Sequence, residues 1–221
     1  MVPDYGDIEL RKEALETARL LLECGAVGYD PDEPFRAGQG FLSPLRIDAR
    51  AALSCPRSRA QLLRLSLEAL DRDAPGIQAV AVAADGAAVP LATLIAEARG
   101  LPLLFVRREE PSSPRKRRVE GKVEPRARVL LVEQLATDGQ RKAALVQPLL
   151  AAGACVTDLF VIFQYGVFDR IHKHVAGLGM QMHALATWWD LLEVARDGGH
   201  LMHDAIAEIE AFLKDPERWR A

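Results

Sequence analysis

The sequence has few cysteines, few aromatic residues, little net charge and no long apolar run. Its three cysteines among 221 residues form no Cys-x-x-Cys pair, which argues against a disulfide framework or a zinc site and predicts buried thiols. The formal net charge of −3 gives no reason to expect nucleic acid as a partner. No apolar run approaches the length of a membrane span, and the first residues lack the pattern of a signal peptide. We therefore expect a cytoplasmic protein without membrane association.

The composition and length of the chain predict one globular domain. Hydrophobic residues make up 49% of the chain and charged residues 27%, which is typical of a folded protein. A chain of 221 residues is long enough for one sizeable core with an N-terminal elaboration, whereas two full domains would be small. We therefore expect a single domain over 1–221, with the elaboration in 1–56 and an α/β core in 57–221.

Apolar runs that are typical of buried strands alternate along the chain with helical segments. The expected strands lie at 78–83, 101–106, 129–132 and 155–166. Helical segments follow most of them, and an amphipathic helix is expected near the start, over 7–24. Alternation of this kind predicts a mostly parallel sheet with crossover helices, which is an α/β fold.

One stretch, 129–142, places polar residues where a strand is expected to end. Its sequence, VLLVEQLATDGQRK, is an apolar strand that reaches Glu133, then a turn at Thr137, Asp138 and Gly139, then a helix. Ligands bind at the carboxyl ends of strands in such sheets, and the free amides of a helix N-terminus can bind phosphate. The alternative is an ordinary turn, in which Asp, Thr and Gly only cap the helix.

The longest polar stretch, 107–127, is rich in arginine and lysine. A loop of this length in a compact domain is usually functional or disordered. We predict a flexible loop there. Two other interpretations stay open, a solvated basic tether and a contact for an anion or nucleic acid.

The stretch 129–142 resembles the phosphoribosyl pyrophosphate motif of type I phosphoribosyltransferases, and the chain from about Leu20 to Trp219 resembles orotate phosphoribosyltransferases. The shared motifs occur in one order, namely EPF, SP, ID, GLP, VEG, RVLLVE, ATDG, AGA and ALATWWD. The resemblance implies the type I phosphoribosyltransferase fold, in which helices flank a mostly parallel central sheet. It also implies a small N-terminal hood within 1–56 and a catalytic loop within 107–127.

The resemblance assigns three groups of site residues. Those for ribose and phosphate are Glu133, Gln134, Thr137, Asp138, Gly139 and Gln140. Those for pyrophosphate are Asp85, Gly86, Arg107 and Arg108. Those for the base are Gln39, Gly40 and Ser43. Mg²⁺ is implied only where phosphoribosyl pyrophosphate binds, and no protein metal site is expected.

Four places in this expected site depart from the family pattern. Pro111 stands where a catalytic lysine is usual, and Gln134 replaces the second of two adjacent acids. Ala83 and Ala84 replace two glycines near the pyrophosphate, and Gln39 replaces a serine at the base. A lysine that meets the charge of the departing pyrophosphate only in the transition state raises turnover, and proline carries no charge.

From these departures we expect a divergent paralogue in pyrimidine nucleotide metabolism whose catalysis is lost or impaired. Such a protein would be retained for binding a nucleotide or another phosphate-bearing ligand, or for a regulatory or subunit role. One alternative is an active phosphoribosyltransferase for orotate or another base. A second alternative is a scaffold for protein interaction. Because the family's sites lie at a two-fold interface, the resemblance implies a homodimer, or a heteromer with a true paralogue.

Overall fold

The structure is a computed structural model that describes residues 7–37, 41–108, 117–137, 139, 142–167, 170–199, 201–216 and 218–219. The chain forms two compact units. The first contains Met1–Leu65, Phe163–Asp169 and Leu185–Ala221, and the second contains Ser66–Ile162 and Arg170–Ala184. The expected single domain over 1–221 stays a prediction. No helix among the described residues is both long enough and apolar enough to cross a bilayer.

The first unit consists of helices and short antiparallel strands. Its elements are α1 (Ile8–Glu23), β1 (Val27–Tyr29), β2 (Phe35–Ala37), β3 (Phe41–Ser43), β4 (Leu45–Ile47), α2 (Arg50–Ser54), the first part of α3 (Pro56–Asp73), α7 (Trp188–Gly198) and α8 (His203–Lys214). Strand β1 pairs with β4, and β2 pairs with β3. Asp7 caps α1 by accepting a hydrogen bond from the Glu9 amide at 2.8 Å. The predicted first helix and the short strands after it are therefore confirmed.

Helix α7 begins at a buried tryptophan. Trp188 is 2% exposed and packs edge to face against Phe163, with ring centroids 5.1 Å apart, and against Tyr165 at 5.6 Å. The carboxylate of Asp190 accepts hydrogen bonds from the Thr187 amide and hydroxyl at 2.7 and 2.8 Å, which fixes the first turn. The ALATWWD motif therefore builds a packed helix start.

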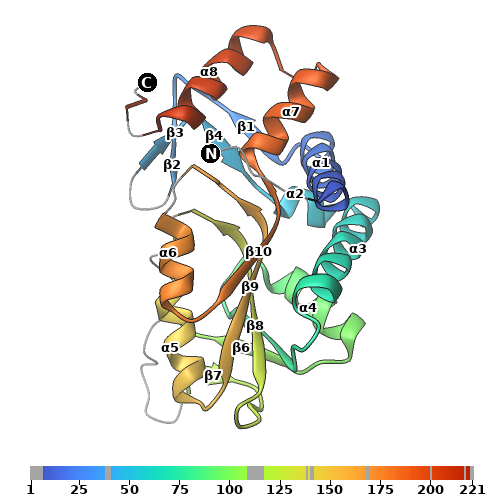
Figure 1. Ribbon diagram of the computed structural model, residues 1–221, viewed down its shortest axis with the longest axis vertical. Coiled ribbons are helices and arrows are strands. Elements are labelled where there is room, and N and C mark those ends of the chain that lie inside the picture. Colours follow the sequence, from blue (N-terminus) through green and yellow to red (C-terminus); the bar gives the residue numbers. More distant parts are fainter. Residues whose placement is uncertain are drawn as a thin grey trace. The chain divides into compact units, whose positions relative to one another are not determined.

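A six-stranded sheet has the order β10-β9-β8-β5-β6-β7. Most of this sheet lies in the second unit, and only the last residues of β9 and β10 belong to the first. The elements are β5 (Ala79–Ala83), α4 (Val89–Arg99), β6 (Leu103–Val106), β7 (Val119–Glu120), β8 (Arg128–Ala136), α5 (Ala143–Ala151), β9 (Cys155–Gln164), α6 (Arg170–Gly177) and β10 (Gln181–Thr187). Strand β5 runs parallel to β6 and β8, whereas β7 is antiparallel to β6. Helices α5 and α6 cover one face and α4 the other (Figure 1). The predicted α/β fold is confirmed.

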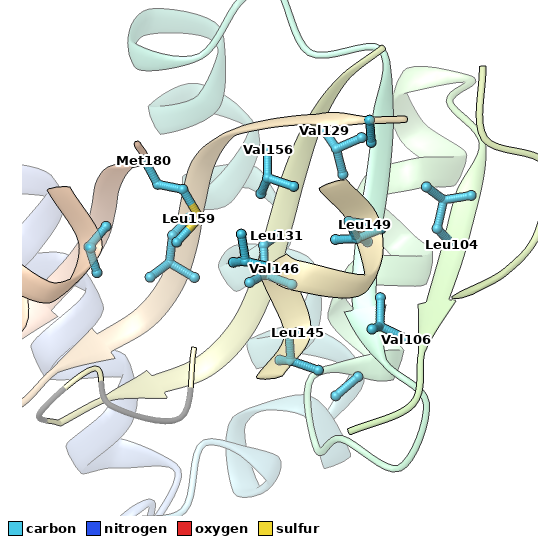
Figure 2. Close-up of a cluster of buried hydrophobic side chains, with 14 of the residues drawn as sticks. Leu104, Val106, Val129, Leu131, Leu145, Val146, Leu149, Val156, Leu159 and Met180 are labelled. Carbon is cyan, nitrogen blue, oxygen red and sulfur yellow. The ribbon is translucent and has the colours of Figure 1, made fainter. Parts of the chain in front are cut away.

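The core of this unit lies between the sheet and the two helices α5 and α6 (Figure 2). Apolar side chains of the sheet, such as Val129 and Leu131, pack with Leu145, Val146 and Leu149 of α5. All five are 0% exposed. Each fully buried side chain of this kind contributes about 1.5–3 kcal/mol to folding. The core therefore holds the ends of β5, β6 and β8 in fixed positions.

A polar cluster lies buried within the same unit. The His183 ring Nε2 lies 2.9 Å from Asp158 Oδ1, and each side chain is 5% exposed. The Thr157 hydroxyl donates to Asp158 Oδ2 at 2.6 Å, and the Arg128 guanidinium lies 3.6 Å from the same oxygen. The carboxylate thus holds groups from β8, β9 and β10 together.

Replacing Asp158 with alanine should lower the free energy of unfolding by about 2–3 kcal/mol, because it leaves a buried histidine without its acceptor. Urea denaturation measures this loss. Thr157→Val is the matched control, since it removes one hydroxyl from the cluster and should cost about 1 kcal/mol. Equal losses in the two variants would show that the Asp158–His183 contact does not stabilise the fold.

Two sequence predictions are wrong in this structure. The cysteines are not buried thiols, since Cys55 and Cys155 are exposed and Cys24 is partly exposed. Cys55 lies between two helices and Cys155 is the first residue of its strand, so neither faces a core. The predicted loop 107–127 also contains β7, which pairs with β6.

Candidate functional site

A pocket of about 470 Å³ lies at the carboxyl ends of β5, β6 and β8, within the second unit. Its walls are the turn that leads into α4, Arg108 just after β6, the last part of β8 and the start of α5. The predicted site residues that line it are Asp85, Gly86, Arg108, Glu133, Gln134, Thr137 and Gly139. The fold therefore brings together residues that lie far apart in the sequence, because parallel strands end at the same edge of the sheet.

Glu133 lies between two cations. Its Oε1 is 3.4 Å from the Arg108 guanidinium, and its Oε2 contacts the Lys142 ammonium. Arg108 also lies 3.8 Å from the carboxylate of Asp85, a side chain that is 77% exposed. Glu133 and Lys142 are only 12% and 8% exposed, so their ion pair is shielded from water.

The position of Glu133 differs from the predicted strand end. Strand β8 continues through Glu133 as far as Ala136, so the predicted boundary is wrong. The pairing of β8 with β5, however, ends at Val132. Glu133 therefore lies just beyond the paired part of the strand, where its side chain can face the pocket.

Gln134 lines the pocket beside Glu133. Its amide nitrogen is buried and has no hydrogen-bond partner among the described residues. A buried donor without an acceptor is costly, and a ligand oxygen would satisfy it.

The predicted phosphate turn depends on a glycine. Gly139 has φ of +80°, and its carbonyl accepts a hydrogen bond from the Lys142 amide at 3.1 Å. A Cβ at this position would lie 2.7 Å from Ile171 Cδ1 and 3.1 Å from His174 Cβ in α6. The positive φ favours glycine here, and a larger residue would also require Ile171 and His174 or the turn itself to shift. Asp138 and Gln140, two further predicted phosphate residues, lie outside the described residues.

The turn after β5 closes on Gly86, whose amide donates to the Ala83 carbonyl at 2.9 Å. A Cβ at Gly86 would lie 3.0 Å from that carbonyl oxygen, so this glycine is required by close packing. Ala83 and Ala84 are outside the positive-φ region, so both alanines are accommodated without backbone strain.

Arg107, which was predicted to bind pyrophosphate, does not line the pocket. Its side chain pairs with Glu120, with a 2.7 Å hydrogen bond, and its amide donates to the Arg118 carbonyl at 2.8 Å. The Arg118 guanidinium donates in turn to the carbonyls of Arg107, Arg108 and Ala144, at 3.2, 2.6 and 3.0 Å. These bonds connect the end of β6 with the start of β7, which flank residues 109–116 in the sequence, and attach them to α5. Pro111 lies outside the described residues.

The predicted base region belongs to the first unit. Ser43 is buried, and its hydroxyl donates to the Leu45 carbonyl at 2.8 Å and accepts from the Leu45 amide at 3.1 Å. These bonds give the hydroxyl a structural role in the turn between β3 and β4. Gln39 and Gly40 lie outside the described residues.

Lys142 is a pocket residue that the sequence analysis did not single out. Burial and the neighbouring Arg108 lower the pKa of its ammonium from 10.5 to about 7. The signal in the sequence is a lysine three residues after the glycine of the phosphate turn, at the start of a helix. It was missed because a lysine at a helix start is ordinarily exposed to solvent.

The side chains in the pocket do not fit a resident divalent cation. Both oxygens of Glu133 face cations, Asp85 pairs with Arg108, and Gln134 is neutral. The described part of the chain also holds no group of three or more His, Cys, Asp or Glu side chains that could bind a metal ion. Mg²⁺ in proteins favours carboxylates that are available for coordination, together with water and substrate phosphates.

Comparison with known proteins adds to this description. No protein-family model matches the chain. The orotate phosphoribosyltransferase of Cereibacter sphaeroides is 41% identical over 206 residues, which cover 92% of this chain and 88% of that protein. That of Roseobacter denitrificans is 37% identical over 223 residues, covering 100% of this chain and 98% of the relative. The crystal structure of orotate phosphoribosyltransferase from Aeropyrum pernix has a TM-score of 0.68 and 28% identity, and the match covers 83% of this chain and 99% of that one.

The parallel sheet with an acid and a glycine turn at its strand ends, together with this structural likeness, defines a phosphoribosyltransferase fold. At the identity and coverage of its relatives, the chain belongs to the orotate phosphoribosyltransferase family. The resemblance inferred from the sequence motifs is therefore confirmed at the level of fold and family.

Proposed function

We propose that this protein transfers the phosphoribosyl group of phosphoribosyl pyrophosphate to orotate. The observation that carries the proposal is the convergence of Glu133, Gln134, Thr137 and Gly139 in one pocket at the strand ends. The names of the relatives support the same reaction, since they are orotate phosphoribosyltransferases. They support activity better than the catalytic loss that we expected from the sequence, and we therefore take activity as the main interpretation.

In this proposal the pocket binds the ribose 5-phosphate half of the substrate. Glu133 accepts hydrogen bonds from the ribose hydroxyls, and the buried Gln134 amide donates to a ribose oxygen. The 5-phosphate would lie at the turn around Gly139, beside the N-terminus of α5, whose first amides have no partner within the helix and can bind an anion. Two ends of one small molecule would thus be held by adjacent parts of one strand-to-helix connection.

The reaction forms a bond between a nitrogen of orotate and C1 of the ribose, while the bond from C1 to the pyrophosphate oxygen breaks. Negative charge therefore grows on the departing pyrophosphate. Arg108 and the turn closed by Gly86 line the same pocket and are the described groups placed to meet that charge.

A turnover assay tests the proposal. Purified protein given orotate, phosphoribosyl pyrophosphate and Mg²⁺ should form orotidine monophosphate, followed by the fall in orotate absorbance. Pro111→Lys should raise kcat about tenfold, because a cation at this position would stabilise the departing pyrophosphate. Pro125→Lys makes the same substitution at an exposed proline that does not line the pocket, and it should leave kcat unchanged.

A second candidate is a protein that binds the nucleotide without turnover. The observation that favours it is the pairing of Glu133 with two cations, since this acid is the one expected to hold the ribose. Absence of product from the wild type and from Pro111→Lys, with orotidine monophosphate binding retained, would support this candidate. Homodimer formation, which the family resemblance implies, stays a prediction for either candidate.

A further inference from the structure

The most unusual group in the pocket is the buried ammonium of Lys142. It contacts the Glu133 carboxylate, and its Nζ donates to the Leu135 carbonyl at 3.3 Å. A lysine ammonium has three N–H donors; two of them have acceptors among the described residues, and the third can be directed at a ligand. The side chain is 8% exposed and comes from the residue just before α5, beside the turn at Gly139. A positive charge is therefore built into the pocket whenever this lysine is protonated.

This charge balances the acid that faces it. Glu133 is shared between Lys142 and Arg108, and the neighbouring Gln134 adds no charge. The family pattern places two adjacent acids at 133 and 134, and two acids side by side favour a divalent cation nearby. In this chain position 134 is a neutral glutamine, and the buried ammonium of Lys142 contacts the one acid, Glu133. The negative charge of Glu133 is therefore already neutralised by cations of the protein.

We propose that Lys142 replaces a divalent cation beside Glu133, so that this pocket binds a ribose 5-phosphate group without metal. The ligand class rests on the proposed function, but the proposal does not depend on turnover. Glu133 still has acceptor capacity for ribose hydroxyls, because a carboxylate has about four lone-pair sites and its two cations leave the others available. The Lys142 ammonium, beside the turn at Gly139, attracts the phosphate dianion.

Burial makes this arrangement effective. Charges inside a pocket are screened less by water than charges on the surface, so one ammonium there attracts an anion more strongly than an exposed lysine. The contact with Glu133 favours the charged form of the lysine, which opposes the effect of burial on its pKa. The groups that face Lys142 are Glu133, Arg108 and, through Arg108, Asp85.

Calorimetric titration with ribose 5-phosphate, at about pH 6.5 so that the lysine is mostly protonated, tests the proposal. This probe lacks the pyrophosphate that would itself carry Mg²⁺. The wild type should bind with the same Kd, within about twofold, in EDTA and in Mg²⁺. Lys142→Met should weaken binding about tenfold or more in EDTA, the usual scale for loss of a hydrogen bond to a charged group.

Lys122→Met is the matched control, because Lys122 is 87% exposed and pairs with Glu124 outside the pocket. It should leave the Kd unchanged. Three results would each overturn the proposal. The wild type could bind at least tenfold more tightly with Mg²⁺ than in EDTA, it could fail to bind in both buffers, or Lys142→Met could bind as tightly as the wild type. If Lys142→Met does not fold, as judged by circular dichroism, the comparison of the wild type in the two buffers decides alone. Product formation together with Mg²⁺-dependent binding of the probe would overturn this inference and leave the proposed reaction intact.

Discussion

Replacing Gly139 with alanine should weaken ribose 5-phosphate binding about 100-fold, with a matching fall in kcat/KM. The new Cβ would lie 2.7 Å from Ile171 Cδ1 and 3.1 Å from His174 Cβ at a φ of +80°, so the crowding and the backbone strain together are expected to shift the turn. Such a shift removes the backbone amides from the phosphate, and a displacement of about 1 Å can cost about 100-fold in rate. Calorimetry with ribose 5-phosphate and the turnover assay measure the two effects.

Gly179→Ala controls for backbone strain. Gly179 has φ of +78°, close to the +80° of Gly139, but a Cβ there would meet no atom within 4 Å. Both variants should lose about 1–2 kcal/mol of stability, because an alanine at positive φ is strained. Only Gly139→Ala should lose binding. Equal affinities in the two variants would show that the turn at Gly139 does not hold the phosphate.

The second large effect concerns stability. Glu133→Gln should lower the free energy of unfolding by about 3–5 kcal/mol at about pH 6.5, because it leaves the Lys142 ammonium buried with Arg108 and no carboxylate between them. Urea denaturation measures the loss. Adding Lys142→Met to Glu133→Gln should restore most of it, since the buried charge is then removed as well.

Glu124→Gln is the matched control for this substitution. Glu124 and Lys122 also form an ion pair, but their side chains are 60% and 87% exposed. Exposed pairs contribute about 0–1 kcal/mol, so this variant should unfold almost like the wild type. A double variant no more stable than Glu133→Gln alone would mean that the two buried residues do not interact energetically.

Most of the fold could be predicted from the sequence because its central strands contain apolar runs. Runs such as 129–132 and the alternation of strand with helix are direct consequences of burial on both faces of a sheet. The order of the strands could not be read from the sequence, since apolar runs of similar length give no pairing code. Short strands such as β7, only two residues long, carry no periodic pattern at all.

The convergence of the predicted site residues was foreseeable because the sequence already predicted a mostly parallel sheet. Asp85 and Arg108 follow β5 and β6, Glu133 follows the paired part of β8, and the carboxyl ends of parallel strands meet at one edge. The buried state of Lys142 was not foreseeable, because it depends on how α5 packs on the sheet. The different environment of Arg107 depends likewise on its partner Glu120, in a strand that the sequence did not reveal.

The hydrogen bonds between Arg107 and Arg118 have an evolutionary consequence. The Arg107 amide bonds to the Arg118 carbonyl, and the Arg118 guanidinium bonds back to Arg107, Arg108 and α5. The pairing of β6 with β7 and the contact to α5 are therefore made by residues that flank 109–116 in the sequence. A substitution at Arg118 would break its bonds to Arg107, Arg108 and α5 together. Selection for a stable fold therefore acts directly on this arginine.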